Sequence, residues 1–385
     1  MNSFFSTDRK IGILGGGQLG KMLALAAAPW DFYLKVLDPS GDAPARHYVK
    51  EFVQGDFRDY HTVLDFGRDC DILTIEIEDV NTHALYDLQR QGKKIYPQPD
   101  IIEIFQDKQR QKQFYTDHHL PTPLYHEFRD RQSLLQHLEQ TRVEFPIIWK
   151  AARGGFDGRG VRKLHAPADA LLLPDVPCIL EECIDILAET AVVVHRSAAG
   201  QIACQPVVQM EFHPTAHFVE LVFAPTSLGS DIEEQCIGLA TRLASELDLV
   251  GTLAVEFFIT TDQRVLINEA APRVHNSGHL TIEATAASQF EQHLRAIAGL
   301  PLGDTTLLHH AVMLNLTGHP DHQGPVHYAG ADRVLAMPRV YLHLYGKSTT
   351  KPHRKMGHIT AIGSHIDELL LQIQTIKNTI HVISI

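Results

Sequence analysis

The chain has 385 residues, enough for two or three domains, and its 44% hydrophobic and 21% charged residues are typical of a soluble globular protein. Its net charge of −12 argues against a general nucleic-acid binder or a binder of anionic membranes, but it allows a local basic pocket for a small anion. None of the 5 cysteines forms a CxxC pair, and no apolar run resembles a signal peptide or the roughly 20 residues of a membrane span. We therefore expect a cytoplasmic protein with free thiols.

The first predicted element is an apolar strand over residues 11–14, followed by GGGQLG at 15–20, a helix over 21–28 and a strand over 33–37. With Asp38 placed 18 positions after Gly20 (38 − 20), this pattern is close to the dinucleotide-binding fingerprint. The glycines allow a tight turn and close approach of a ligand to a helix N-terminus, but they do not identify the ligand. Nicotinamide binding therefore stays open at this point.

The alternation of strands and helices continues, with strands predicted at 52–53, 72–77 and 95–96 and a helix at 61–68. This order predicts a parallel sheet with helices on both faces. Glu76 lies at the carboxyl end of the fourth strand, where open α/β sheets bind ligands. Its carboxylate could accept hydrogen bonds from ribose hydroxyls, or it could cap the next helix.

A polar helix carrying Lys108 is predicted over 100–118, and we place a domain boundary near residue 105. FPIIWK then predicts a strand that ends at Lys150, and four glycines follow within the seven positions 154–160. Backbone N–H groups of such a loop can wrap phosphates, so we expect a flap. It is not a Walker A loop, because no Gly-Lys-Ser/Thr follows, and a glycine-rich surface hairpin without function is the alternative.

Strands are predicted over 178–184 and 188–194, and helices over 231–247 and 281–298. Between these helices, strands at 253–259 and 264–268 form a predicted hairpin that carries Glu256 and Glu269. Buried carboxylates need partners, and two carboxylates beside the amide of Asn268 suit Mg²⁺ completed by nucleotide phosphates. The alternative is two glutamates in separate surface ion pairs.

The remaining 85 or so residues predict short strands and loops, with YGK at 345–347 and RKMGH at 354–358. Lys347, Arg354 and Lys355 near one loop suit a terminal phosphate, which arginine can bind through two hydrogen bonds. A solvated run of charge is the alternative.

One long motif, NEAAPRVHNSGH at 268–279, resembles the signature of the ATP-grasp enzymes of purine synthesis, and among them the N5-carboxyaminoimidazole ribonucleotide synthetase family. Further similar motifs, GGGQLGKM, IEIEDV, FPIIWKAARGGFDGRG and YGK…RKMGH, spread over about residues 10–360. The resemblance implies an α/β and α+β fold in three parts. These are a Rossmann-like pre-ATP-grasp domain with a parallel sheet (1–105), an ATP-grasp domain (106–300), and a small β-rich C-terminal domain (301–385) that packs on the ATP-grasp site.

The resemblance also implies the site residues. Those expected to hold ATP are Lys108, Lys150, Gly155, Phe156, Asp157, Gly158, Arg159, Gly160, Val161, Glu181, Glu182, Cys183, Ile184, Glu189, His213, Asn268 and Glu269. Glu256 and Glu269 would bind Mg²⁺ or Mn²⁺. Those expected around the ribonucleotide are Gln18, Leu19, Glu76, Asp157, His275, Asn276, Lys347, Arg354 and Lys355. Asp157, Lys150 and Arg273 are the candidate catalytic residues.

The implied reaction is ATP-dependent carboxylation of 5-aminoimidazole ribonucleotide (AIR) with bicarbonate, through carboxyphosphate, in purine (IMP) biosynthesis. Lys150, the metal and the flap amides would neutralise the phosphoryl charge. A carboxylate among phosphates is electrostatically unusual, so we expect Asp157 to act on the amine as a base, unless it only pairs with Arg153 or Arg159.

The family is expected to form homodimers, with AIR and bicarbonate as small-molecule partners and no nucleic acid or membrane partner. Three alternatives stay open: a formate-dependent glycinamide ribonucleotide transformylase, a nicotinamide-dependent oxidoreductase, and a non-catalytic ATP-binding relative.

Overall fold

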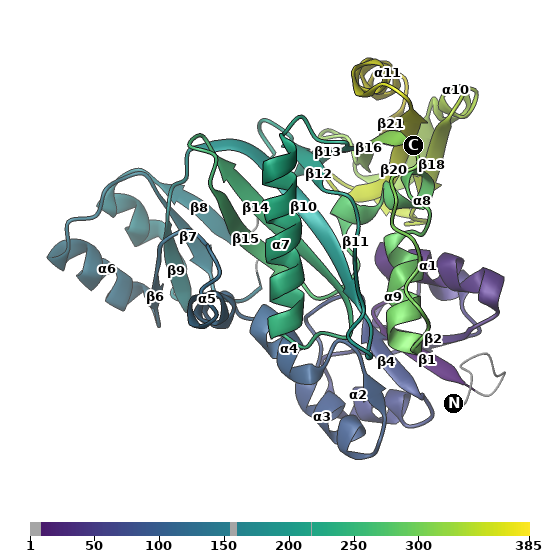
Figure 1. The fold of residues 1–385 in the computed structure, drawn as a ribbon, viewed down its shortest axis with the longest axis horizontal. Coiled ribbons are helices and arrows are strands. Elements are labelled where there is room, and N and C mark those ends of the chain that lie inside the picture. Colours follow the sequence, from purple (N-terminus) through teal and green to yellow (C-terminus); the bar gives the residue numbers. More distant parts are fainter. Residues whose placement is uncertain (1–8, 155–159, 217) are drawn as a thin grey trace.

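The computed structural model describes residues 9–154, 160–216 and 218–385 (Figure 1). The fold combines a parallel sheet near the N-terminus, a small antiparallel sheet, and a large antiparallel sheet that runs into the C-terminal region. The α/β and α+β class expected from the sequence is thereby confirmed. Among the described residues, no helix combines the length and the apolar character that a membrane crossing requires.

The N-terminal sheet has five parallel strands in the order β3-β2-β1-β4-β5, as the alternating pattern predicts. Its strands are β1 (Lys10–Leu14), β2 (Tyr33–Asp38), β3 (Glu51–Gln54), β4 (Ile72–Ile75) and β5 (Lys94–Ile95). The helices between them are α1 (Gln18–Ala27), α2 (Tyr60–Gly67) and α3 (Thr82–Arg90), with 3₁₀ turns η1 (Ala28–Trp30) and η2 (Arg46–Tyr48). Apolar side chains fill both faces of the sheet, which accounts for the nearly continuous apolar strands.

The single polar helix expected over 100–118 is wrong. The structure has two helices there, α4 (Pro99–Phe105) and α5 (Lys108–Asp117). The chain leaves helical geometry at Asp107, whose carboxylate accepts a hydrogen bond from the N–H of Gln109 at 3.0 Å and caps α5. Because of this break, α5 is a separate helix, and its lysines reach both antiparallel sheets.

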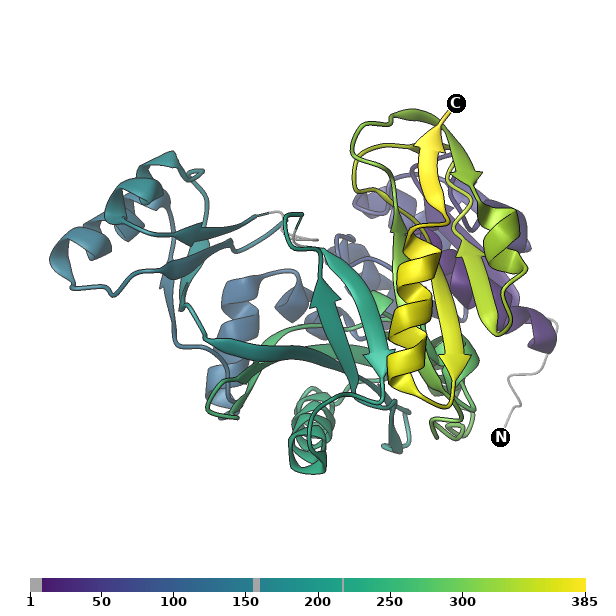
Figure 2. The same ribbon diagram turned by 90° about the horizontal axis from the view of Figure 1, so that it is seen from above.

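The small antiparallel sheet has the order β6-β9-β7-β8 and packs with a helix around the buried ring of Trp149. Its elements are β6 (Tyr125–Phe128), α6 (Arg131–Gln140), β7 (Ile147–Ala151), β8 (Val161–Leu164), η3 (Pro167–Leu172) and β9 (Cys178–Glu182). Figure 2 shows this sheet and α6 on the far side of the large sheet from the C-terminal segments.

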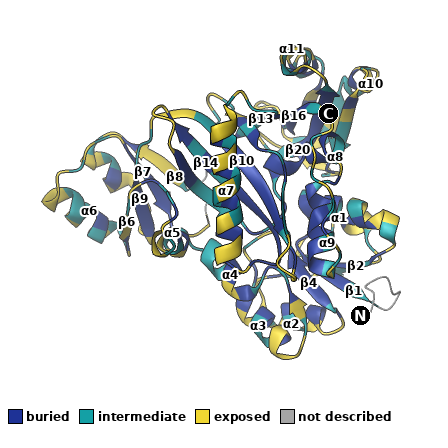
Figure 3. Cartoon of the chain, viewed as in Figure 1, coloured by how far each residue is buried: buried dark blue, intermediate teal, exposed yellow. Residues whose placement is uncertain are grey.

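The large sheet has nine strands in the order β15-β14-β10-β12-β13-β16-β20-β18, with β11 paired to β10. Its first six strands along the chain are β10 (Ile186–Arg196), β11 (Ile202–Cys204), β12 (Val208–Phe212), β13 (Val219–Ala224), β14 (Gly251–Thr260) and β15 (Val265–Ala271). Helix α7 (Ser230–Glu246) lies across one face, with its buried side on the sheet and its exposed side in solvent (Figure 3).

The helix expected over 281–298 is also wrong. The structure has α8 (Thr281–Ala284) and α9 (Gln289–Ala298), preceded by a 3₁₀ turn, η4 (Asn276–Gly278). Ser288 caps α9 by accepting the N–H of Glu291 at 3.3 Å, and Thr285 forms a β-bridge with Leu307, so the chain is extended between the helices.

The C-terminal region shares the large sheet, because strands β16, β20 and β18 continue it from β13. The elements are β16 (His310–Thr317), β17 (Gly324–Ala329), α10 (Ala331–Leu335), β18 (Val340–Leu344), β19 (Thr349–Thr350), β20 (Lys355–Gly363), α11 (Ile366–Lys377) and β21 (His381–Ser384). Strands β19, β17 and β21 form a separate three-stranded sheet. Helices α10 and α11 were not predicted from the sequence.

The glycine loop before α1 surrounds a carboxylate of the chain itself. Glu76 accepts a hydrogen bond from the N–H of Gly17 at 2.7 Å and another from the N–H of Gly20. A Cβ added to Gly15, whose φ is +101°, would lie 2.3 Å from Cγ of Glu76. Glu76 therefore caps α1 and not the helix after it. Burial raises the pKa of Glu76, against the lowering effect of these hydrogen bonds.

The acidic residue of the fingerprint is also engaged by backbone, since Asp38 accepts N–H groups of Gly16 at 2.7 Å and Ser40 at 2.8 Å. The glycines are thus explained by packing within the chain, without a dinucleotide.

We expect Gly15→Ala to lower stability more than Gly92→Ala. Both glycines have positive φ, which costs an alanine about 1–2 kcal/mol. Only Gly15 faces Glu76, whereas Gly92 has nothing within 4 Å, so overpacking should add about 1–3 kcal/mol at Gly15 alone. Thermal unfolding of the two variants measures the difference, and equal shifts would show that Glu76 moves aside freely.

Candidate functional site

The predicted hairpin is present, and its two carboxylates lie directly opposite each other. In the antiparallel pair β14–β15, Glu256 is the partner of Glu269, at a point where the register shifts. Side chains opposite each other on neighbouring strands have Cβ atoms about 4.5–5.5 Å apart, so the two negative groups share one small volume. The prediction that the strands bring both carboxylates to one point is confirmed.

Cations surround this pair unevenly. Lys108, at the start of α5, forms a close ion pair with Glu269, and its charge holds the pKa of Glu269 well below its usual range. Burial raises the pKa of Glu256, and the charge of Glu269 raises it further. His275 is the nearest described ion-pair partner of Glu256, at 3.8 Å.

The pair fits a hard divalent cation, because a cation would relieve the repulsion between two carboxylates at the same register position. The described residues contain no cluster of three or more His, Cys, Asp or Glu side chains able to hold a metal ion. A cation at Glu256 and Glu269 would therefore take its remaining ligands from a bound substrate or water.

A second buried group of charges lies beside the hairpin. Lys150, at the end of β7, contacts Oε2 of Glu181 at 2.6 Å and donates to Oδ1 of Asn268 at 3.0 Å. Lys112, which sequence reasoning missed, contacts Oε1 of Glu181 at 2.6 Å. Both side-chain oxygens of Glu181 thus face lysines, and its contact with ATP stays a prediction. The spacing of Lys108 and Lys112, one helical turn apart, is the signal that could have identified Lys112.

The chain after β9 contains the residues expected near the adenosine. Glu182 accepts the N–H of Leu124 at 2.8 Å, so its carboxylate is engaged by the preceding linker, and Cys183 and Ile184 are half-buried. Glu189 lies on β10 opposite Phe258, and burial raises its pKa to about 7.

The structure describes the predicted glycine-rich flap only in part. Gly155, Phe156, Asp157, Gly158 and Arg159 lie outside the described residues. The flanking residues are Gly160, whose carbonyl accepts the N–H of Ala151 at 2.9 Å, and Val161, which pairs with Lys150 across β7 and β8.

The loop after β15 is fixed by contacts that the sequence did not reveal. Arg273 pairs with Glu78 of the N-terminal region at 2.8 Å. The amides of Asn276 and Asn315 exchange two hydrogen bonds, at 2.9 and 2.8 Å, so that Asn276 is held from strand β16. The side chain of His275 accepts the N–H of Ser277.

The three C-terminal cations lie close together. Lys347 donates to the carbonyl of Lys355 at 2.7 Å, and Arg354 donates to the carbonyl of Thr349 at 2.7 Å. Lys355 is close enough to Glu256 to lower its pKa, against the raising effect of burial. Of the three cations, Lys355 is therefore the one whose charge acts on the carboxylate pair.

Helix α1 brings the N-terminal loop toward the same place, since Lys21 donates to the carbonyl of Leu344 at 2.8 Å. Gln18 is half-buried at the start of α1. The side chain of Leu19 is buried in the apolar core, so any contact it makes with a substrate involves its backbone.

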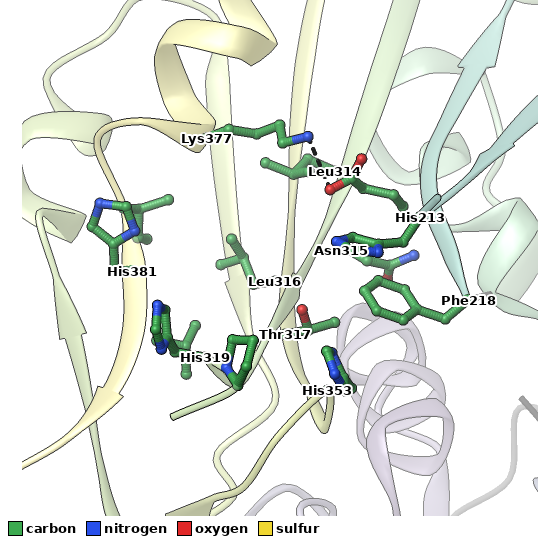
Figure 4. A pocket seen from close by; sticks show the side chains of 15 residues that line it. His213, Phe218, Leu314, Asn315, Leu316, Thr317, His319, His353, Lys377 and His381 are labelled. Atoms are coloured by element: carbon green, nitrogen blue, oxygen red, sulfur yellow. Dashed lines mark ion pairs between the residues drawn. The ribbon is translucent and has the colours of Figure 1, made fainter. Parts of the chain in front are cut away.

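His213 lies at the edge of a cavity of about 180 Å³ against the C-terminal region, drawn in Figure 4. Its ring stacks on Phe218 with a centroid distance of 5.2 Å, and its Nδ1 accepts the N–H of Ala216 at 3.2 Å. His353 and the ion pair of Lys377 with Glu220 line the same cavity. The contact of His213 with ATP stays a prediction.

Three family models match successive parts of the chain. They are the ribonucleotide synthetase preATP-grasp domain at residues 8–106, the ATP-grasp domain at 113–290, and the phosphoribosylaminoimidazole carboxylase C-terminal domain at 311–372.

Individual proteins match over almost the whole chain. The N5-carboxyaminoimidazole ribonucleotide synthase of Bacillus subtilis is 36% identical, over 94% of this chain and 94% of its own length. The crystal structure of N5-carboxyaminoimidazole ribonucleotide synthetase from Thermotoga maritima superimposes with a TM-score of 0.90 at 38% identity, covering 98% of this chain and 100% of that one. N5-carboxyaminoimidazole synthase from Aspergillus clavatus, in complex with ADP and AIR, gives a TM-score of 0.87 at 31% identity, with 97% and 98% covered.

We expect Asn315→Ala to lower stability by about 1–3 kcal/mol, because it leaves the buried amide of Asn276 without its partner. The exposed Asn378→Ala is the control and should change stability by less than about 0.5 kcal/mol. Chemical denaturation measures both. Equal effects would mean that the amide pair adds nothing to the position of this loop.

Proposed function

Since the chain belongs to the family of N5-carboxyaminoimidazole ribonucleotide synthases, which are ATP-grasp ligases, we propose how its residues carry out that reaction. The chain is an ATP-dependent ligase that carboxylates AIR in purine biosynthesis, as the sequence predicts. The observation that carries the residue assignments is the pairing of Glu256 with Glu269, with Lys108 bound to Glu269 and the charge of Lys355 acting on Glu256.

ATP lies between the two antiparallel sheets in this proposal. Its phosphates are bound by Lys108, Lys150 and the amides of the flap, and its ribose and adenine by Glu189 and the chain at 181–184. The remaining expected ATP contacts are those of His213, Asn268 and residues 155–161. The support comes from the convergence of Lys108 and Lys150 on β15, where each contacts a neighbouring residue, Glu269 or Asn268.

Glu256 and Glu269 would bind Mg²⁺, or Mn²⁺ in its place. A divalent ion between carboxylates and phosphates supplies charge neutralisation for phosphoryl transfer. Lys108 already compensates Glu269, so a cation would chiefly serve the less compensated Glu256.

Bicarbonate is the proposed source of the carboxyl group. One of its oxygens attacks the γ-phosphorus, ADP leaves, and carboxyphosphate forms. The exocyclic amine of AIR then forms a C–N bond to the carboxyl carbon, directly or after CO₂ is released, and phosphate leaves with the electron pair of the C–O bond. The amine gives up one proton, and we propose that the carboxylate of Asp157 accepts it. Arg273, which pairs with Glu78, would stabilise the carboxyphosphate.

AIR would bind between the N-terminal loop and the C-terminal cations. Lys347, Arg354 and Lys355 bind its 5′-phosphate, and His275 and Asn276 approach from the loop after β15. On the opposite side lie Gln18, the backbone of Leu19, and Glu76. The carboxylate of Glu76 already accepts two backbone N–H groups, so any hydrogen bond to the ribose would be added to these.

Four further assignments are part of the proposal. They are the use of bicarbonate, a homodimer, a cytoplasmic location, and the division of the chain at residues 105 and 300. The oxidoreductase alternative rested on the glycine loop, and Glu76 of the chain itself occupies that loop. The transformylase alternative is not favoured, because the relatives named above are carboxyaminoimidazole ribonucleotide synthases.

Release of ADP in paired assays tests the function. With Mg·ATP, we expect turnover with AIR plus bicarbonate and none with glycinamide ribonucleotide plus formate. Glu269→Gln is the control variant, because it should lose most of the activity while keeping the fold. Wild-type turnover by this variant would contradict the metal assignment. Formate-dependent turnover by the wild-type chain would show that it is a glycinamide ribonucleotide transformylase instead.

We expect Arg354→Ala to raise KM for AIR about 10- to 100-fold, because a hydrogen bond to a charged group contributes about 1.5–3 kcal/mol. KM for ATP should change by less than about 3-fold, as for a substitution outside that site. Lys351→Ala, in the same loop and exposed, is the matched control and should leave both values near those of the wild type. Equal increases in both KM values for Arg354→Ala would contradict the phosphate assignment.

A further inference from the structure

The two lysines of α5 serve different carboxylates. Lys108 pairs with Glu269, whereas Lys112, one turn later, points to Glu181 of strand β9. Lys112 is almost completely enclosed, with a side chain that is 2% exposed, and so is its partner Glu181. Removing an ionised group from water costs free energy, and such a charge is retained only where other groups compensate it. The groups around Lys112 therefore need an explanation.

Three oxygen atoms lie within 3.3 Å of Nζ of Lys112. Its Nζ lies 2.6 Å from Oε1 of Glu181, 2.5 Å from Oγ1 of Thr122, and 3.3 Å from the carbonyl of Asn268. The contacts with Thr122 and Asn268 are hydrogen bonds and the contact with Glu181 is an ion pair, and the enclosed ammonium group is not open to a ligand. Lys112 therefore does not bind substrate, and any effect it has on the reaction passes through its neighbours.

The neighbour that matters is Glu181, because it is shared. Its Oε2 lies 2.6 Å from Nζ of Lys150, while its Oε1 faces Lys112. Two ammonium groups thus share one carboxylate, which leaves a positive charge that no protein group in this set compensates. If Lys112 were neutral or absent, both oxygens of Glu181 would be free to compensate Lys150 alone.

Lys112 also joins the two sheets. Glu181 is on β9 of the four-stranded sheet, whereas Asn268 is on β15 of the nine-stranded sheet, and Lys150 contacts the same two residues. The two lysines therefore hold Glu181 and Asn268 together from different elements, α5 and β7, and fix the position of Lys150 between the sheets.

We propose that Lys112 is a positioning residue that preserves the charge and direction of Lys150 toward the phosphates of ATP, by occupying one of the two carboxylate oxygens of Glu181. This inference rests on the proposed binding of ATP by Lys150. Its consequence is that Lys112 strengthens the binding of the phosphates and not that of the nucleoside.

The test compares ATP with adenosine, which lacks phosphates. In Lys112→Met, affinity for ATP should fall about 10-fold or more, because the contact between Lys150 and the phosphates is weakened. Affinity for adenosine should stay within about 2-fold of wild type. Calorimetry on the full chain measures both. Lys112→Arg keeps the charge and should recover part of the ATP affinity.

Lys35→Met is the matched control, because Lys35 is another enclosed lysine, 7% exposed, paired with Asp69 at 2.8 Å and Glu51 at 3.3 Å in the N-terminal sheet. It should lower stability without changing the ratio of ATP to adenosine affinity. If Lys112→Met does not fold, Thr122→Val replaces it. That variant removes one acceptor of Lys112, and it should lower ATP affinity about 3-fold and leave adenosine unchanged.

A double-mutant cycle tests the route through Glu181. In a Glu181→Gln background, Lys112→Met should change ATP affinity by less than about 2-fold, because the shared carboxylate is gone. A ratio of ATP to adenosine affinity equal to wild type in Lys112→Met would overturn the inference and leave Lys112 a structural residue. If the wild-type chain itself does not bind ATP, the proposed function fails instead.

Discussion

Ion pairs between three lysines and two glutamates hold helix α5 against both antiparallel sheets. The two lysines of α5 pair with glutamates of β15 and β9, and Lys150 of β7 pairs with the same glutamate of β9 and donates to Asn268 of β15. An ionised group left unpaired in such a place costs several kcal/mol. The helix, the hairpin and both sheets must therefore reach their positions together, and a shift of any one would leave a charge without its partner.

The same compensation leaves a local imbalance that a substrate can use. Glu269 has Lys108 as a direct partner, whereas Glu256, opposite it, has only His275 at 3.8 Å among the ion pairs described for it. One end of the cluster therefore favours a cation and the other, around Lys150, favours an anion. A nucleotide with its metal ion presents both, which explains why one small region accommodates them side by side.

How much of this was predictable depended on the range of the contacts. The hairpin was predictable because two apolar runs and a polar turn of four residues lie next to each other in the chain. A regular register would set Glu256 opposite Asn268, and the register shift beside Phe257, which the sequence did not predict, sets it opposite Glu269 instead. The glycine loop was recognised, but its occupant was not, because Glu76 is 59 residues from Gly17. The helix over 100–118 failed at Asp107, where a capping carboxylate outweighed a continuous polar pattern. Lys112 was missed because its spacing from Lys108 indicates only a shared helix face, and its partner Glu181 lies on a strand of another region. Much of the site was identified instead through the resemblance of long motifs.

The continuation of the large sheet from β13 into β16 limits how the chain could be shortened. Leu221 and Phe223 of β13 belong to the same apolar cluster as Val312 of β16 and Ile373 of α11. A truncation before β16 would turn β13 into an open edge with uncovered apolar side chains, and such edges pair readily with other molecules. A shortened chain for crystallography or for a fusion protein should therefore keep residues 310–385 attached, even where only the nucleotide site is of interest.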